Sequence, residues 1–324
     1  ALGTAAFLFF SPGVERHEPV TTVLTDHGPD LFRLPGDFEP QDIMFLAGGP
    51  LADRHPELLT RLVRSLGTDI AIRLLHDPSA GASRLTSILA DPALADHDLQ
   101  AVPLPVRSVW IRDFGPRTVS DDLGRRSMVE FAHHDRRHQA RDAKLAAQLA
   151  VALDLTLMGG PLSLERGELI GNGRGFGMIS EAMVEQNAAA LGFGPDDVLQ
   201  KVASLLGIEY LTVVPPLEGE PTCQVVLFCA FLAPDLVVVG QYAKEADPAN
   251  ATRLDATADF LAGLTTRAGR LRVERLPMPD HEDGAWRTYT AIVFANEMVL
   301  VPQFPAYCPD LDAKALAFYR RLLP

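Results

Sequence analysis

Short runs of β-prone residues recur along the chain at similar intervals. Their centres lie 59 to 67 residues apart, and most of the runs end in glycine or proline. Stretches with apolar residues at three- and four-residue steps, typical of amphipathic helices, separate them. The predicted strands are centred at Ile43, Trp110, Leu169, Leu236 and Val299, and the predicted helices cover Pro56–Leu66, Ala140–Leu153, Asp196–Leu206 and Asp255–Ala268.

This alternation of strands and helices predicts an α/β protein built from repeated units. A fixed period with mixed strand and helix content favours five units that close on themselves over one doubly wound sheet. No change of composition marks a linker, so we expect one main domain in the 324 residues. We assign it to residues 34–324 and treat residues 1–33 as an N-terminal arm or the remnant of a signal or anchor segment.

The apolar stretch Leu2–Phe10 bears on the choice between an arm and a signal remnant. Its nine residues are too few to cross a bilayer, so no membrane-spanning segment is predicted. The basic residues that open a signal peptide are absent before it, which favours an ordinary strand or arm. We therefore expect a cytoplasmic protein, or an exported or anchored one if this stretch is a signal remnant.

Composition narrows the choice of ligand. Hydrophobic residues make up 47% of the chain and charged residues 22%, as in ordinary globular proteins. The net charge of −13 argues against nucleic acid, which requires a basic surface, and favours small cationic ligands. Oligomeric state is not fixed by these numbers, and a homo-oligomer stays open.

Neither cysteine nor histidine spacing predicts a metal site or another cofactor. Cys223, Cys229 and Cys308 form no Cys-x-x-Cys pair. The cluster of His133, His134 and His138 is surrounded by aspartate and arginine, which is more typical of a solvated loop than of a metal centre.

The segment Val109–Pro116 (VWIRDFGP) carries the most informative chemistry. Asp113 offers a carboxylate and Trp110 a ring face, a combination that suits a planar guanidinium ion. The alternative is a strand-terminal ion pair between Arg112 and Asp113, with Trp110 in the core.

Several motifs occur together in an order that resembles the agmatine deiminase and bacterial peptidylarginine deiminase family. The family belongs to the guanidine-modifying superfamily, and the resemblance implies a five-bladed α/β propeller (pentein) of ββαβ units. It covers residues from about Leu34 to the end of the sequence. The matching segments are LPGDFEPQDIMFLA from Leu34, VWIRDFGP, Glu165–Leu169 with Asn172–Gly175, Glu220–Thr222 with Phe228–Pro234, Thr288–Tyr289, Val299–Pro302, Asp312 and Ala315.

The resemblance implies a covalent hydrolysis of the guanidinium group. Guanidinium is stabilised by resonance, so two carboxylates hold it planar and protonated while a cysteine thiolate attacks its central carbon. A histidine moves protons to the leaving ammonia and from the incoming water. A further aspartate orients the substrate or the histidine.

Only part of this set is present. Asp113 and Glu165 match the two carboxylates, and Trp110 and Arg112 match residues of the first motif, so these four are the predicted substrate-binding residues. In place of Gly-His-x-Asp the chain has Cys223–Val226.

The departures fall on the positions that move protons. Gln224 stands at the histidine position, where its amide cannot exchange a proton near pH 7, and Val226 stands at the aspartate. Arg166 replaces a glycine and Ala291 an asparagine. In the family the nucleophilic cysteine lies in a glycine-rich strand tens of residues after the final helix, a position beyond Pro324.

Two functions stay open. The first is a catalytically degenerate protein that binds a small guanidino compound or peptidyl-arginine in the remaining pocket. The second is an active guanidine hydrolase, of the kind that in putrescine biosynthesis acts on agmatine, using Cys223 or a cysteine outside the sequence. An inert buried thiol is the commoner role of a free cysteine, so we favour the first.

Overall fold

The computed structural model describes residues 22–24, 32–80, 83–132, 142–281 and 283–323. Over these residues the chain forms an α/β protein with six separate sheets. The smallest is the hairpin of β13 (Thr265–Thr266) and β14 (Gly269–Arg270), and none of the six closes on itself within this described part.

The first sheet is entirely parallel and is covered by helices. Its strands are β2 (Ile43–Leu46), β3 (Ala71–Leu75) and β4 (Leu99–Val102). The helices are α1 (Gly48–Arg54), α2 (Pro56–Ser65) and α3 (Ser83–Leu89). Proline opens α2, where its missing N–H costs nothing, and Leu59 and Val63 are buried on one face.

The next three sheets repeat one pattern, in which an antiparallel hairpin is followed by helix and then by a strand parallel to the second hairpin strand. Crossover helices are the usual connection between parallel neighbours. The second sheet has β5 (Arg117–Ser120), β6 (Arg126–Ala132), α6 (Leu145–Ala152) and β7 (Thr156–Ser163). The third has β8 (Leu169–Gly171), β9 (Phe176–Ser180), α7 (Glu181–Leu191), α8 (Pro195–Leu206) and β10 (Tyr210–Val214), and the fourth has β11 (Cys229–Ala233), β12 (Leu236–Gln241), α9 (Pro248–Gly263) and β15 (Arg272–Pro277).

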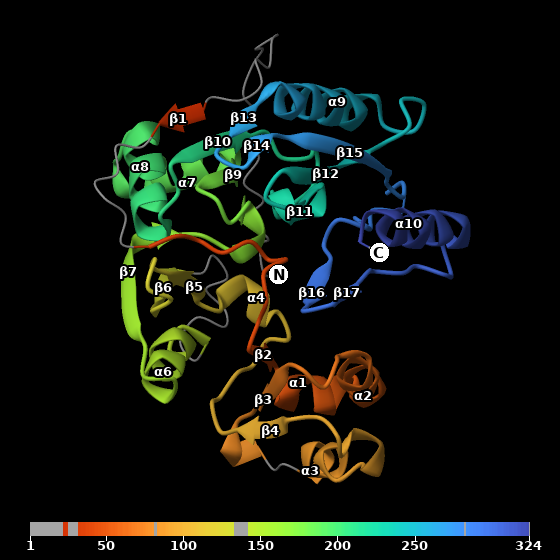
Figure 1. Cartoon of the computed structure of the whole chain (residues 1–324). Helices are drawn as coiled ribbons and strands as arrows, with labels where there is room; N and C mark the ends of the chain where they lie inside the picture. Colours follow the sequence, from red (N-terminus) through yellow and green to blue (C-terminus); the bar gives the residue numbers. More distant parts are fainter. Residues whose placement is uncertain (1–21, 25–31, 81–82, 133–141, 282, 324) are drawn as a thin grey trace, which may run out of the picture.

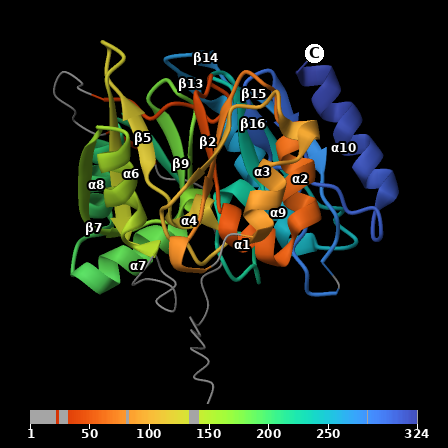
Figure 2. The same cartoon turned by 90° about the horizontal axis from the view of Figure 1, so that it is seen from below.

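The last unit contacts the first. It consists of the hairpin β16 (Val293–Ala295) and β17 (Met298–Leu300), followed by α10 (Pro309–Leu322). Ala295 packs in the same apolar cluster as the helices and strands of the first sheet. In Figure 1 the units follow one another in chain order, with β2–β4 at the bottom, β5–β7 at the left and β16–β17 at the right. Figure 2 shows α6, α7 and α8 on one side and α10 on the other, outside the strands.

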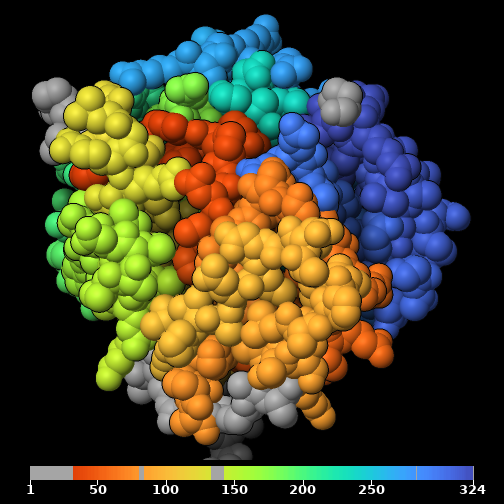
Figure 3. All heavy atoms as spheres, turned by 60° about the horizontal axis from the view of Figure 1, so that its bottom comes forward, coloured from red at the N-terminus to blue at the C-terminus, as the bar shows by residue number. Residues whose placement is uncertain are grey.

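Residues 32–41, which we call the central segment, run between these units. The backbone of Arg33 exchanges two hydrogen bonds with Ser120 of β5, at 2.8 and 3.0 Å. At the other end, Gln41 N donates to Asn296 Oδ1 at 2.8 Å, and the Phe38 ring packs edge-on against Phe294 at 6.4 Å. In Figure 3 the red residues of this part of the chain lie between the yellow-green and blue regions. The central segment therefore joins units that are distant in sequence.

The strand β1 (Thr22–Leu24) lies within residues 1–33, which were expected to be an arm. It pairs antiparallel with β10, Val23 lying opposite Leu211. The whole apolar stretch Leu2–Phe10 lies outside the described residues, as does the cluster of His133, His134 and His138.

Four of the five predicted strands are confirmed, at β2, β8, β12 and β17, but the strand at Trp110 is wrong. That segment forms the four-residue helix α4 (Ile111–Phe114), and the nearby strand begins only at Arg117. Local hydrogen bonds, from Asp113 N to Trp110 O at 3.0 Å and from Gly115 N to Ile111 O at 2.8 Å, satisfy the backbone instead. Trp110 is 69% exposed, so the alternative that placed it in the core is wrong.

The predicted helices at Pro56–Leu66 and Asp196–Leu206 are confirmed by α2 and α8. Within the helix expected at Ala140–Leu153, the structure has α6, which begins at Leu145 and ends at Ala152. The helix expected at Asp255–Ala268 instead begins at Pro248 and ends at Gly263. Asp247 caps the first turn of α9 by accepting a hydrogen bond from Asn250 N at 2.9 Å. The spacing of apolar residues gave no indication of this earlier helix start.

No helix in the described part of the chain has both the length and the apolar character needed to cross a membrane.

We predict that Gly207→Ala destabilises the protein far more than Gly192→Ala. Both glycines end helices with positive φ, 60° and 68°, so alanine at either costs about 1 kcal/mol of backbone strain. A Cβ at Gly207 would in addition collide with the carbonyl oxygen of Phe32, whereas the space at Gly192 is open. The expected loss at Gly207 is about 3 kcal/mol or more.

Urea unfolding of both variants and the parent measures the difference, with Gly192→Ala as the matched control. Equal losses of unfolding free energy would contradict the close approach of α8 to the central segment.

Candidate functional site

The short helix α4 presents the residues of the Val109–Pro116 motif. Its four residues end at Gly115, where Pro116 prevents a further turn. Trp110 precedes the helix and leaves its ring largely in solvent, while Arg112 turns toward the interior. Asp113 lies near enough to Arg112 to stabilise the charged guanidinium. The motif therefore leaves the Trp110 ring exposed and places the Asp113 carboxylate close to Arg112.

Glu165 lies at the start of the short 3-10 helix η3 (Arg166–Glu168), which packs against α4. Glu168 is buried and its carboxylate accepts a hydrogen bond from the backbone N–H of Glu165 at 2.7 Å, which fixes the turn. The second predicted carboxylate thus comes from an element that adjoins the first. The structure therefore brings α4 and η3 together.

Gln224 contacts Glu165 directly. Its amide Nε2 donates a hydrogen bond to Glu165 Oε2 at 3.2 Å. The amide packs closely over Gly167, where any Cβ would collide with it. Val226 is 6% exposed and packs in an apolar cluster with Phe228 and Val237. Gln224 and Val226 are therefore both integrated into the surrounding packing.

Asp37 of the central segment was not predicted as a site residue, yet it organises the site. Its Oδ2 accepts a hydrogen bond from Arg112 Nη2 at 2.9 Å, and its Oδ1 accepts one from Arg166 Nη2 at 2.8 Å. Burial alone would raise the pKa of Asp37, but Arg166 and Arg112 overcome it and hold that pKa well below its usual range. The carboxylate is therefore charged at neutral pH.

Arg117, at the start of β5, is a third arginine of this group and was also not predicted. It is 5% exposed, and its Nη2 donates to the carbonyl oxygens of Arg166 at 2.7 Å and of Leu169 at 3.2 Å. Burial and the like charge of Arg166 lower the pKa of Arg117 to about 9. It remains a cation at neutral pH and holds the backbone of η3 in place.

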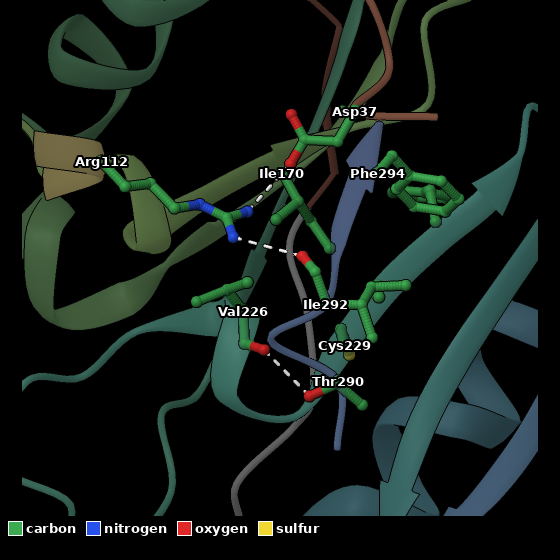
Figure 4. Close-up of a pocket in the computed structure, with 11 residues that line it drawn as sticks. Asp37, Arg112, Ile170, Val226, Cys229, Thr290, Ile292 and Phe294 are labelled. Carbon is green, nitrogen blue, oxygen red and sulfur yellow. Dashed lines mark hydrogen bonds and ion pairs between the residues drawn. The ribbon is translucent and has the colours of Figure 1, made fainter. Parts of the chain in front are cut away.

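Asp37 and Arg112 line a narrow cavity (Figure 4). Arg112 also donates to the carbonyl oxygen of Ile292 at 3.4 Å, and Thr290 Oγ1 donates to the carbonyl oxygen of Val226 at 2.9 Å. The remaining lining is mostly apolar and comes from β8, β11 and β16, namely Ile170, Gly171, Cys229, Ala230, Phe231 and Phe294. Among the predicted binding residues Arg112 faces this cavity, whereas Trp110, Asp113 and Glu165 are absent from its lining.

The three cysteines differ in environment. Cys229 is fully buried at the start of β11, and burial raises the pKa of its thiol far above the usual range. Cys308 precedes α10, 3.4 Å from the hydroxyl of Tyr289. Cys223 is half-buried in the left-handed conformation at φ 54°, and its Sγ lies 3.7 Å from the carbonyl oxygen of Glu220. Burial, Glu220 and Glu168 raise the pKa of the Cys223 thiol, which keeps it protonated at neutral pH.

A second group of titratable side chains lies in the fourth unit. His281 Nε2 is 2.9 Å from Asp247 Oδ2, and its ring stacks on Trp286 with centroids 3.7 Å apart. Tyr242 contacts the same imidazole edge-on at 5.8 Å. Within the described ranges no group of three or more His, Cys, Asp or Glu residues has the arrangement of a metal site.

Sequence signals for the missed residues were weak. Asp37 and Arg117 are ordinary charged residues beside loops. Only contacts with distant residues distinguish them: Asp37 forms ion pairs with Arg112 and Arg166, and the buried Arg117 donates to backbone carbonyl oxygens. Arg166 was noted as a change from glycine, and that change proves to place a guanidinium on Asp37.

Fold and site together define a protein of the guanidino-modifying deiminase class. The chain belongs to the family described as Porphyromonas-type peptidyl-arginine deiminase, whose model matches residues 35–324. A Streptomyces coelicolor protein provisionally named agmatine deiminase is 24% identical over 320 residues, covering 90% of this chain and 91% of that protein.

Solved structures show the same fold. The agmatine deiminase of Enterococcus faecalis superposes with a TM-score of 0.73 at 18% identity, over 90% of this chain and 88% of that one. The agmatine deiminase of C. jejuni gives a TM-score of 0.70 at 15% identity, over 89% and 87% of the two chains.

We predict that Asp37→Asn lowers the free energy of unfolding at pH 7 and that the loss shrinks in acid. The folded-state pKa of Asp37 lies below the unfolded one, so its stabilisation is complete above about pH 5 and fades as pH falls through the folded-state pKa. Because the side chain is 39% exposed, the expected loss at pH 7 is modest, about 1 to 2 kcal/mol.

Urea unfolding at pH 7 and pH 3 measures this change, with Asp259→Asn on the exposed face of α9 as control. A loss of stability that is constant between the two pH values would show that the Asp37 charge does not hold the site together.

Proposed function

We propose that this chain is a catalytically degenerate deiminase that binds a guanidino compound or peptidyl-arginine without hydrolysing it at an enzymatic rate. The observation that carries the proposal is the hydrogen bond from Gln224 to Glu165. A neutral amide stands at the proton-transfer position and engages one of the two carboxylates expected to hold the substrate.

The chemistry follows from that contact. Hydrolysis needs a group that gives a proton to the leaving ammonia and takes one from water, and an amide does neither near pH 7. Val226, packed in the apolar cluster, adds no carboxylate that could substitute. Loss of such a residue alone typically removes several orders of magnitude of rate, since the catalytic groups act as a unit.

The alternative, an active hydrolase with Cys223 as nucleophile, is disfavoured by the state of that thiol. A nucleophilic cysteine needs a lowered pKa, produced by cations or a histidine. Burial and the charge of Glu220 act on Cys223 in the opposite direction. Its thiolate fraction at neutral pH is therefore smaller than that of a free cysteine.

Binding requires less than catalysis. Trp110 offers an exposed ring face, and Asp113 and Glu165 offer carboxylates from two adjoining elements, with Arg112 as a positioning neighbour. Charge-assisted bonds to a guanidinium do not depend on a nucleophile. The net charge of −13 steers a cationic ligand toward the protein.

For the fold, we propose that the five main sheets are the blades of a five-bladed propeller. Three consecutive units share the ββαβ order, and the last hairpin contacts the first sheet through Ala295 and through the bonds of Gln41 to Phe294 and Asn296. Contact between first and last units is what closure of such a ring requires.

We expect no ammonia or citrulline release from agmatine or an arginine peptide, together with measurable binding of agmatine by titration calorimetry. The double variant Asp113→Asn, Glu165→Gln should lose at least about tenfold in affinity, because both charged acceptors become neutral. Arg126→Ala, on the exposed end of β6, is the matched control and should bind like the parent.

Turnover near about 1 per second or faster would overturn the degenerate assignment. Agmatine binding that is unchanged in the double variant would instead show that Asp113 and Glu165 are not the binding site.

A further inference from the structure

Two guanidinium groups of the chain itself bind one carboxylate at this site. Arg112 reaches Asp37 from α4 and Arg166 reaches it from η3, each on a different oxygen. Asp37 lines the cavity of Figure 4 and its side chain is 39% exposed, so the carboxylate is reachable from solvent. A charged, partly exposed carboxylate in a concave site is a good acceptor for an external guanidinium.

The two arginines are held differently. Arg112 lines the cavity and is tied to Ile292 as well as to Asp37, and Asp113 adds a favourable charge. Arg166 is the first residue of η3, directly after the cap residue Glu165. Its guanidinium reaches across to Asp37, and its side chain is 36% exposed. Arg166 is therefore the partner of Asp37 that can leave without dismantling the cavity wall.

We propose that Arg166 is an internal guanidinium ligand that fills a subsite on Asp37 Oδ1. This inference rests on the proposed function as a guanidino-binding protein and names a specificity-determining residue for it. An external guanidino compound reaches Asp37 only when Arg166 swings away. Its affinity is lowered by the fraction of time that the subsite is filled.

The local charges fit a cation in this place. When Arg166 leaves, Arg112 and Arg117 remain as positive groups, and Asp37, Asp113 and Glu168 remain as negative ones around them. The subsite then carries no excess positive charge that would repel a guanidinium. The subsite also favours a guanidinium over an ammonium ion, because the guanidinium is planar and more weakly hydrated.

The test uses methylguanidinium as a probe of the size of the arginine head group. Arg166→Ala should bind it at least about tenfold more tightly than the parent, which corresponds to a subsite filled about nine-tenths of the time. Methylguanidinium should also raise the Tm of Arg166→Ala, whereas methylammonium should not. Arg125→Ala, which removes an arginine from an exposed ion pair with Asp121, is the matched control and should behave like the parent.

A second variant assigns the gain to Asp37. The double variant Asp37→Asn, Arg166→Ala should lose the gained affinity, and Arg166→Gln, of similar size, should keep it if the alanine variant does not fold. Equal methylguanidinium affinity in the parent and in Arg166→Ala or Arg166→Gln would overturn the proposal. So would a gain that survives Asp37→Asn.

Failure here is separable from failure of the proposed function. Agmatine binding by the parent that depends on Asp113 and Glu165 but is unaffected by Arg166→Ala would leave the guanidino-binding function intact and refute the internal ligand. Absence of agmatine binding in the parent, with methylguanidinium bound only by Arg166→Ala, would refute the proposed function and support the internal ligand.

Discussion

The carboxylate of Asp37, held between Arg112 and Arg166, is the interaction on which the rest of the site depends. It joins the central segment, α4 and η3, three parts of the chain that share no sheet. An ion pair of this kind stabilises little by itself, because removing charges from water offsets much of the attraction. Its effect is to specify geometry: with Arg117 beneath η3, it fixes the turn that carries Glu165. The hydrogen bonds of Arg33 and Gln41 extend the same segment to the second and last units.

The departure from hydrolytic chemistry that we propose rests on two residues within this framework. Gln224 is held by Glu165 on one side and by the close approach of Gly167 on the other. Val226 belongs to the apolar core of the fourth unit. Gln224 keeps a hydrogen-bond partner, and Val226 packs in the core and also lines the narrow cavity. In the function that we propose, the two carboxylates retain the recognition part of the chemistry without the proton transfer.

The sequence predicted the α/β class, four of the strands and two of the helices, because buried strands and amphipathic helices leave a period in the apolar residues. It failed at Trp110, where an aromatic and β-branched run forms a helical turn because Trp110 lies in solvent and no strand partner pairs with it in the described structure. Asp113, Glu165 and Gln224 were selected from motif order, and their role in a site belongs to the proposed function. The roles of Asp37 and Arg117 could not be predicted, because the residues that they contact lie 49 to 129 positions away in the sequence.

The pairing of β1 with β10 has a consequence for solubility. The sheet of the third unit runs β1-β10-β9-β8, so β1 covers the side of β10 that would otherwise present a row of free backbone donors and acceptors. Exposed edges of this kind recruit strands from other molecules. The three residues Thr22–Leu24 thus act as a protective cover. A chain that began after Leu24 would leave the edge of β10 free to pair with strands of other molecules. Its site and all its other strands would be unchanged.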